Sequence, residues 1–306
     1  MNNYLFLNGL ESYLEQINHP QAEVCSTIKK AVLHGNPYAI RDLILTEMKR
    51  GYTDHSEQLV KAIISNLLKD EDDVNARRVL SLLSYNVDDP YIRNAARWSI
   101  KWHRKINLDD HFSRGQMKSK LWLVEELGKV LDEKHAQGYT IENVVQYGGW
   151  FATVAFLILQ DPRIKQYISL DLDKSCVAIA DYFNEDNYKN EWRFKAAVQD
   201  VDGITWEDRT FNTHFMNRHK QKIKMRVGPS LIINTSCEHM TEDWFYKLPK
   251  DMLVCLQTNN YFSRQEHINC VNGINEALAK YKFSHVYYSG ENDMELYTRF
   301  MIIGRT

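Results

Sequence analysis

The sequence predicts an α/β protein with a doubly wound, mainly parallel seven-stranded sheet, whose last strand is antiparallel and which follows an all-α N-terminal region. From about residue 140 onward, apolar runs alternate with helix-like stretches, which favours parallel strands with helices on both faces. The last two apolar runs, 283–288 and 296–303, enclose only a short Gly-Glu-Asn-Asp turn at 290–293. Without a helix between them, the final strand must run antiparallel.

The N-terminal third shows helical periodicity and little else. One apolar stripe recurs at spacings of three and four residues over 60–68, and a second does so over 40–48. We therefore expect a helical domain over 1–110 and a separate sheet domain over 111–306. The polar stretch 107–120 joins them, and an amphipathic helix follows it at 121–131. The stretch is either a cofactor-binding connector or a solvated linker.

The first predicted strand of the sheet ends in a pair of glycines. Val144 and Val145 precede Gly148 and Gly149, and a helix is expected over 153–159. Glycines after a buried strand let the backbone approach a ligand, and the next helix start offers free N–H groups. The second strand ends on Asp171, an acid placed to accept hydrogen bonds from two ribose hydroxyls. The alternative is a tight turn that needs glycine only for its positive φ.

Three further apolar runs end in polar residues, which we expect at the carboxyl ends of parallel strands, where open α/β sheets bind ligands. The run 194–198 is followed by Asp200 and the run 252–256 by Gln257-Thr258-Asn259. The run 231–233 is followed by Asn-Thr-Ser-Cys-Glu-His-Met, which ends at Met240.

This order of glycine turn, acids and polar loop resembles class I S-adenosylmethionine-dependent methyltransferases over roughly 140–306. The runs LVCLQTN and ELYTRFMIIGR resemble that family's fifth and reversed terminal strands. One departure is that Gln146 stands where the family usually has an acid, and Trp150 where it usually has a small residue. The resemblance implies a Rossmann-like methyltransferase sheet that binds S-adenosylmethionine against Tyr147, Gly148, Gly149, Trp150, Asp171, Leu172, Asp200, Val201, Asn234, Thr235 and Lys120.

Several of these residues also admit a purely structural interpretation. Asp171 is preferred to Asp173 as the ribose acceptor, because Asp173 is placed to cap a helix over 174–183. Asp200 either accepts from the adenine amine or is a turn aspartate. Glu238 and His239 are the candidate catalytic residues, as a base or as substrate-positioning groups. Their alternative is a pair of structural residues that opens a helix.

Composition narrows the class of protein. The 306 residues carry a formal net charge of −2, which argues against a surface that generally coats nucleic acid. Five scattered cysteines without a C-x-x-C pair are typical of reduced thiols, and no signal peptide or membrane span is evident. We therefore expect a cytoplasmic protein. No His, Cys or Asp cluster stands at metal-ligand spacing along the sequence, so no metal is predicted.

The leading functional hypothesis is methyl transfer from S-adenosylmethionine to a nitrogen or oxygen of a small or medium-sized acceptor. The alternatives are an enzyme that uses the aminobutyrate arm of the same cofactor in a lyase or cyclisation reaction, and a catalytically idle binding module. A nicotinamide dinucleotide is the competing cofactor. A small molecule is preferred as acceptor, although the basic run 218–226 keeps tRNA as an alternative. The helical region either covers the acceptor pocket or forms a homodimer interface.

Overall fold

The computed structural model describes residues 114–184, 192–217, 219, 221–294 and 296–306. The chain divides into two units, Met1–Lys118 and Ser119–Thr306. The predicted helical domain over 1–110 therefore lies outside the described residues. So do the segment 107–113 and the basic residues Arg218 and Lys220.

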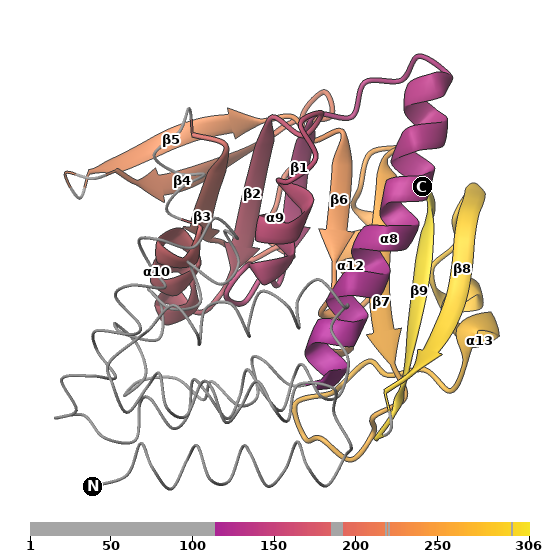
Figure 1. Ribbon diagram of the computed structural model, residues 1–306. Coiled ribbons are helices and arrows are strands. Elements are labelled where there is room, and N and C mark those ends of the chain that lie inside the picture. Colours follow the sequence, from indigo (N-terminus) through magenta and orange to yellow (C-terminus); the bar gives the residue numbers. More distant parts are fainter. Residues whose placement is uncertain (1–113, 185–191, 218, 220, 295) are drawn as a thin grey trace, which may run out of the picture. The chain divides into compact units, whose positions relative to one another are not determined.

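A seven-stranded sheet forms the second unit, with the order β3-β2-β1-β6-β7-β9-β8 (Figure 1). Five neighbouring strands run parallel, and β9 runs antiparallel to both β7 and β8. This confirms the predicted doubly wound sheet with its reversed last strand. The strands are β1 (Asn143–Tyr147), β2 (Gln166–Asp171), β3 (Phe194–Val198), β6 (Leu231–Asn234), β7 (Leu253–Asn259), β8 (His285–Asp293) and β9 (Thr298–Arg305).

Helices cover both faces of this sheet, because successive strand residues point to opposite sides. Val144 of β1 packs in a core with α8 (Arg114–Ala136), α9 (Thr153–Ile158) and α10 (Lys174–Phe183). Its neighbour Val145 packs on the other face with α12 (Asp243–Tyr246) and α13 (Ile274–Lys280). Each strand is therefore apolar at consecutive positions, as parallel strands buried on both sides require.

Two predicted boundaries match and two predictions are wrong. The strand 194–198 and the helix 174–183 have the predicted limits. The turn predicted at 290–293 is wrong, because these residues continue β8 and pair with β9 up to Thr298. The solvated-linker interpretation of 107–120 is wrong from residue 114 onward, since α8 begins there and buries Ser119 and Lys120.

The basic run before β6 forms part of an antiparallel ribbon that the sequence did not predict. Its strands are β4 (Phe211–Met216) and β5 (Lys222–Val227), and Figure 1 shows the ribbon beyond the β3 edge of the sheet. Phe211 and Phe215 on one face are buried in the core. The opposite face is exposed and carries the cross-strand partners Asn212, His214, Met216, Lys222, Lys224 and Arg226.

Candidate functional site

The turn after β1 is closed so tightly that it requires both glycines. Gly148 has a φ of 57°, and a Cβ there would lie 2.8 Å from the Cβ of Ser236. A Cβ on Gly149 would lie 1.8 Å from the Oγ of Ser169. The Ser236 hydroxyl also donates to the Gly148 carbonyl at 2.9 Å. The turn is thereby fixed between the ends of β2 and β6.

Trp150 continues this turn in a backbone conformation that is uncommon for a large side chain. Its φ is 49°, and Ala152 has a φ of 53°. Such left-handed residues cost free energy and persist only where surrounding contacts hold them. The Trp150 N–H donates to Oδ2 of Asp171 at 2.8 Å, and its ring stacks on Phe151. The ammonium of Lys120, from α8, lies 5.7 Å from the centre of the indole.

The Asp171 carboxylate accepts hydrogen bonds from backbone N–H groups of two different loops. One oxygen accepts from Trp150, and the other accepts from the N–H of Asp173 at 2.9 Å. Burial raises the pKa of the Asp171 carboxyl, and the two backbone N–H groups partly offset that effect. Each carboxylate oxygen can accept a second hydrogen bond, so the group retains capacity for a diol. Leu172 follows Asp171 and is 70% exposed, so its side chain is accessible to a ligand.

Asp173 has the structural role that the sequence predicted. Its carboxylate accepts from the N–H of Ser175 at 2.7 Å and caps α10 at Lys174. The hydrogen bonds from Ser175 lower the pKa of the Asp173 carboxyl, the opposite direction from Asp171. The two carboxylates thus differ in environment although only Leu172 separates them.

The other predicted cofactor residues follow β1 and β3. Tyr147 ends β1 and is buried in the core with its ring edge on Trp244. Asp200 accepts from the N–H of Asp202 at 3.0 Å, which is the geometry of a turn aspartate. Val201 is partly buried against the core. Asp200 therefore has a structural role here whether or not it also contacts a ligand.

Polar contacts also connect the end of β6 to β1. Asn234 is buried and accepts from the N–H of Ser236 at 2.9 Å. Thr235 accepts from the side-chain amide of Gln146 at 3.2 Å, and Gln146 in turn accepts from the Tyr167 hydroxyl at 2.9 Å. Gln146 stands where class I methyltransferases usually have an acid. Its side-chain N–H and its side-chain oxygen both form hydrogen bonds within the chain.

The two predicted catalytic residues lie in η1 (Cys237–His239) and differ in their surroundings. Glu238 is buried, and its Oε1 accepts from Asn259 at 2.8 Å and from Arg299 at 3.0 Å. Burial lowers the pKa of the Arg299 guanidinium, but Glu238 and Tyr297 together outweigh that effect and raise it. His239 is exposed, and its Nδ1 lies 3.2 Å from the Glu266 carbonyl. Glu238 is held by a buried ion pair, whereas His239 faces solvent.

Arg299 and His267 at this edge were not predicted from the sequence, and Asn259 was expected only as a polar residue at the end of its strand. Asn259 ends β7, Arg299 lies in β9, and His267 comes from the loop after β7 with its ring 4.7 Å from that of His239. For Arg299, the one signal in the sequence was that a basic residue stands in the otherwise apolar run of β9, which indicates a buried partner of opposite charge. No pattern along the chain connects His267 to His239, because 27 residues separate them.

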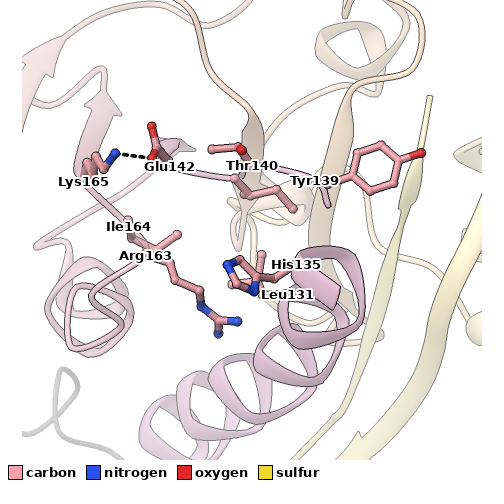
Figure 2. A pocket seen from close by; sticks show the side chains of 9 residues that line it. Leu131, His135, Tyr139, Thr140, Glu142, Arg163, Ile164 and Lys165 are labelled. Carbon is pink, nitrogen blue, oxygen red and sulfur yellow. Dashed lines mark ion pairs between the residues drawn. The ribbon is translucent and has the colours of Figure 1, made fainter. Parts of the chain in front are cut away.

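A hollow of about 190 Å³ lies at the opposite ends of β1 and β2 (Figure 2). Its wall includes His135 of α8 and the residues Glu142 and Lys165, which directly precede β1 and β2 and form an ion pair. Arg163 on the same wall pairs with Asp132 at 2.7 Å. The charged groups of this hollow have partners within the chain, and none of the predicted site residues lines it.

Comparison with known proteins gives matches at the level of structure alone. No family model and no curated protein matches the sequence. The magnesium protoporphyrin IX methyltransferase of Synechocystis PCC 6803, solved with bound S-adenosylhomocysteine, is 11% identical at a TM-score of 0.45 over 67% of this chain and 92% of its own. The N-methyltransferase NodS of Bradyrhizobium japonicum WM9 is 11% identical at a TM-score of 0.40, over 60% and 96%. The cyclase SpnF is 10% identical at a TM-score of 0.40, over 54% and 74%.

The strand order decides the fold independently of these matches. The resemblance implied a mainly parallel sheet of seven strands with a reversed last strand, and β9 is that strand. The structure adds that β9 lies between β7 and β8. The fold is a Rossmann-like sheet of the kind that class I S-adenosylmethionine-dependent methyltransferases have. The glycine turn, Asp171, Asn234 and Glu238 all lie at or just after the carboxyl ends of parallel strands, where open α/β sheets bind ligands. No helix within the described residues is long and apolar enough to cross a membrane.

Proposed function

We propose that the chain transfers a methyl group from S-adenosylmethionine to a nitrogen or oxygen of a small or medium-sized acceptor. The observation that carries the proposal is the turn Gly148–Trp150, hydrogen-bonded to the Asp171 carboxylate at the carboxyl edge of a methyltransferase sheet. Side-chain atoms at positions 148 and 149 are excluded by neighbours at 2.8 and 1.8 Å. These neighbours fix the turn, and the hydrogen bond from Trp150 holds the Asp171 carboxylate at the edge of the sheet where a nucleoside would bind.

The residues present fit such a cofactor by type and position. Asp171 would accept from the ribose hydroxyls, and Asp200 from the adenine amine next to Val201. Lys120, which is buried and lies over the Trp150 ring, would bind the cofactor's carboxylate. S-adenosylmethionine itself supplies the reactive methyl group. The role of the chain is to bind and orient, since transfer depends mainly on the alignment of the reacting groups.

His239 is the better candidate for removing a proton from the acceptor. It is exposed at the end of β6, whereas Glu238 is buried with its Oε1 on Arg299 and Asn259. A neutral imidazole can accept a proton near physiological pH. Glu238 would act on the loop that carries His239, as a positioning residue.

Calorimetric titration of the full chain with S-adenosylmethionine and with NAD tests the proposal. We expect S-adenosylmethionine to bind and NAD not to bind, and Asp171→Ala to weaken the binding. Asp173→Ala is the matched control, because Asp173 is an acid two positions away whose carboxylate is used by α10. Binding of NAD alone, or equal binding by Asp171→Ala and the unaltered chain, would contradict the proposal.

Products separate the proposed reaction from its alternatives. S-adenosylhomocysteine indicates methyl transfer, whereas methylthioadenosine indicates attack on the aminobutyrate arm. Tight cofactor binding without either product, across amine and hydroxyl acceptors, would favour an idle binding module. Mass spectrometry of the reaction mixture measures all three outcomes.

The exposed face of the β4–β5 ribbon favours one alternative acceptor. Lys222, Lys224 and Arg226 lie on that face, with no acidic residue among their cross-strand partners. Such a face suits a phosphate backbone, so tRNA is the second candidate. A charge-removal variant, Lys222→Gln with Lys224→Gln, distinguishes the two. It should leave small-acceptor turnover unchanged, and it should weaken tRNA binding only if tRNA is the acceptor.

A further inference from the structure

We propose that Glu238, His239 and His267 form a binding site for a divalent transition-metal ion. One ligand atom from each of the three residues lies within 4.8 Å of the other two. Our expectation of no metal considered only spacing along the sequence, and His267 joins this cluster through the fold. The inference goes beyond the proposed function and does not depend on cofactor binding. In the ion-bound chain the free lone pair of His239 is used by the ion, so the role of His239 as a base applies to the ion-free chain alone.

Glu238 has an oxygen available for a metal. Its Oε1 is occupied by Asn259 and Arg299, whereas its Oε2 is buried and has no hydrogen-bond partner within the part of the chain that the structure describes. A buried carboxylate oxygen without a partner is costly, and such atoms call for an explanation. A bound cation provides one, because it would satisfy Oε2 while Oε1 keeps its two donors.

Both imidazoles are oriented as metal ligands usually are. Nδ1 of His239 lies 3.2 Å from the Glu266 carbonyl, and Nδ1 of His267 lies 2.8 Å from the Tyr261 carbonyl. A carbonyl can only accept, so each Nδ1 carries the proton and each Nε2 keeps its lone pair. Ring N–H groups donated to backbone carbonyls fix the tautomer of metal-binding histidines in this way.

The ligand set indicates the class of ion. Two imidazole nitrogens and one carboxylate oxygen suit Zn²⁺, Mn²⁺, Fe²⁺ or Co²⁺, whereas Ca²⁺ and Mg²⁺ prefer oxygen ligands alone. Arg299 pairs with Oε1 of Glu238 and leaves Oε2 to the ion. Three protein ligands leave positions open to water or to an oxygen or nitrogen donor.

Titration of the full chain with Co²⁺, followed by visible absorption, tests the site. We expect one equivalent to bind with the d–d bands of a nitrogen and oxygen environment. His239→Ala and His267→Ala should each weaken the affinity at least about tenfold. His239 is exposed, so its replacement leaves the fold intact and keeps the test valid even if Glu238→Gln disturbs the buried pair. His285→Ala is the control, since His285 is exposed at the start of β8.

Three outcomes would overturn the proposal. The first is the absence of Co²⁺ binding, and the second is an unchanged affinity in both His239→Ala and His267→Ala. The third is a thiolate charge-transfer band, which would assign the ion to a cysteine such as Cys270, whose Sγ lies 3.9 Å from Nδ1 of His267. Cofactor titration of the same variants is a separate measurement, so a failure of the metal site and a failure of the proposed function remain distinguishable.

Discussion

At the glycine turn, the hydroxyl of Ser169 decides which residue can stand at position 149. A Cβ on Gly149 would lie 1.8 Å from Oγ of Ser169 but 3.2 Å from its Cβ. We expect Gly149→Ala to destabilise the chain by about 1–3 kcal/mol, the usual cost of inserting atoms into a packed site. Adding Ser169→Ala removes the closest atom and should recover most of that loss.

Chemical denaturation of the single and double variants measures this coupling. Ser169→Ala alone is the control for loss of the hydroxyl. If the double variant is as unstable as Gly149→Ala, the contact between positions 149 and 169 is not what requires the glycine.

The Asp171 carboxyl predicts how cofactor binding depends on pH. Burial raises its pKa, so on acidification it takes up its proton at a higher pH than an exposed aspartate does. Only the ionised carboxylate can accept a hydrogen bond from a ribose hydroxyl at each of its two oxygens, because the protonated group carries a hydrogen on one of them. S-adenosylmethionine affinity should therefore be full above this raised pKa and fall as the pH drops through it. Calorimetry across the acidic range measures the midpoint.

Two comparisons check that prediction. Asp171→Asn should bind weakly at every pH, with little further change on acidification. Asp173→Ala should keep the pH dependence and move its midpoint slightly to lower pH, because the charge of Asp173 contributes to the raised pKa of Asp171. Loss of the pH dependence in Asp173→Ala would assign it to Asp173 instead. By linkage, the raised pKa also means that ionised Asp171 costs folding stability as pH rises.

Residue roles were predictable where they depend on local sequence. Asp173 precedes a helix and caps it, as predicted, and Asp171 ends a strand at the carboxyl edge of the sheet. The partners of Glu238 were not predictable in the same way. Asn259 and Arg299 come from β7 and β9, and only the pairing of these strands brings them together.

At the scale of the elements, α10 depends on its cap. The Asp173 carboxylate accepts from both the N–H and the hydroxyl of Ser175. Asp173→Ala should destabilise the chain by about 1 kcal/mol, the usual contribution of an N-cap aspartate. Denaturant unfolding measures this loss, and Asp173→Asn, which retains the accepting oxygen, should lose less. Equal losses in the two variants would mean that the carboxylate does not act as a cap.

Two elements were predicted incorrectly. The residues 290–293 were interpreted as a turn, and the basic run 218–226 was considered only for its charge. Gly290 to Asp293 contains typical turn residues, yet β8 is an edge strand with exposed side chains and tolerates them. The ribbon was missed because its exposed face is basic. Both of its strands alternate, with Phe211 and Phe215 inward and Lys222 and Lys224 outward, so the period of two was present in the sequence.

For the whole molecule, the chain divides into two units at 118/119, and the predicted domains over 1–110 and 111–306 stay a prediction. The prediction that residues 1–110 shape the acceptor pocket, or alternatively form a homodimer interface, concerns residues outside those described and stays a prediction. Light scattering of the full chain with and without S-adenosylmethionine measures whether a dimer forms.

The central claim is that the cofactor binds at the carboxyl edge of the sheet. Hydrogen–deuterium exchange of the full chain, with and without S-adenosylhomocysteine, tests it most directly because the two ends of β1 and β2 lie in different peptides. We predict slower exchange at 147–152 and 171–175 and no change at 135–142 and 163–166, which border the hollow at the other end. Slower exchange confined to 135–142 and 163–166 would contradict the claim.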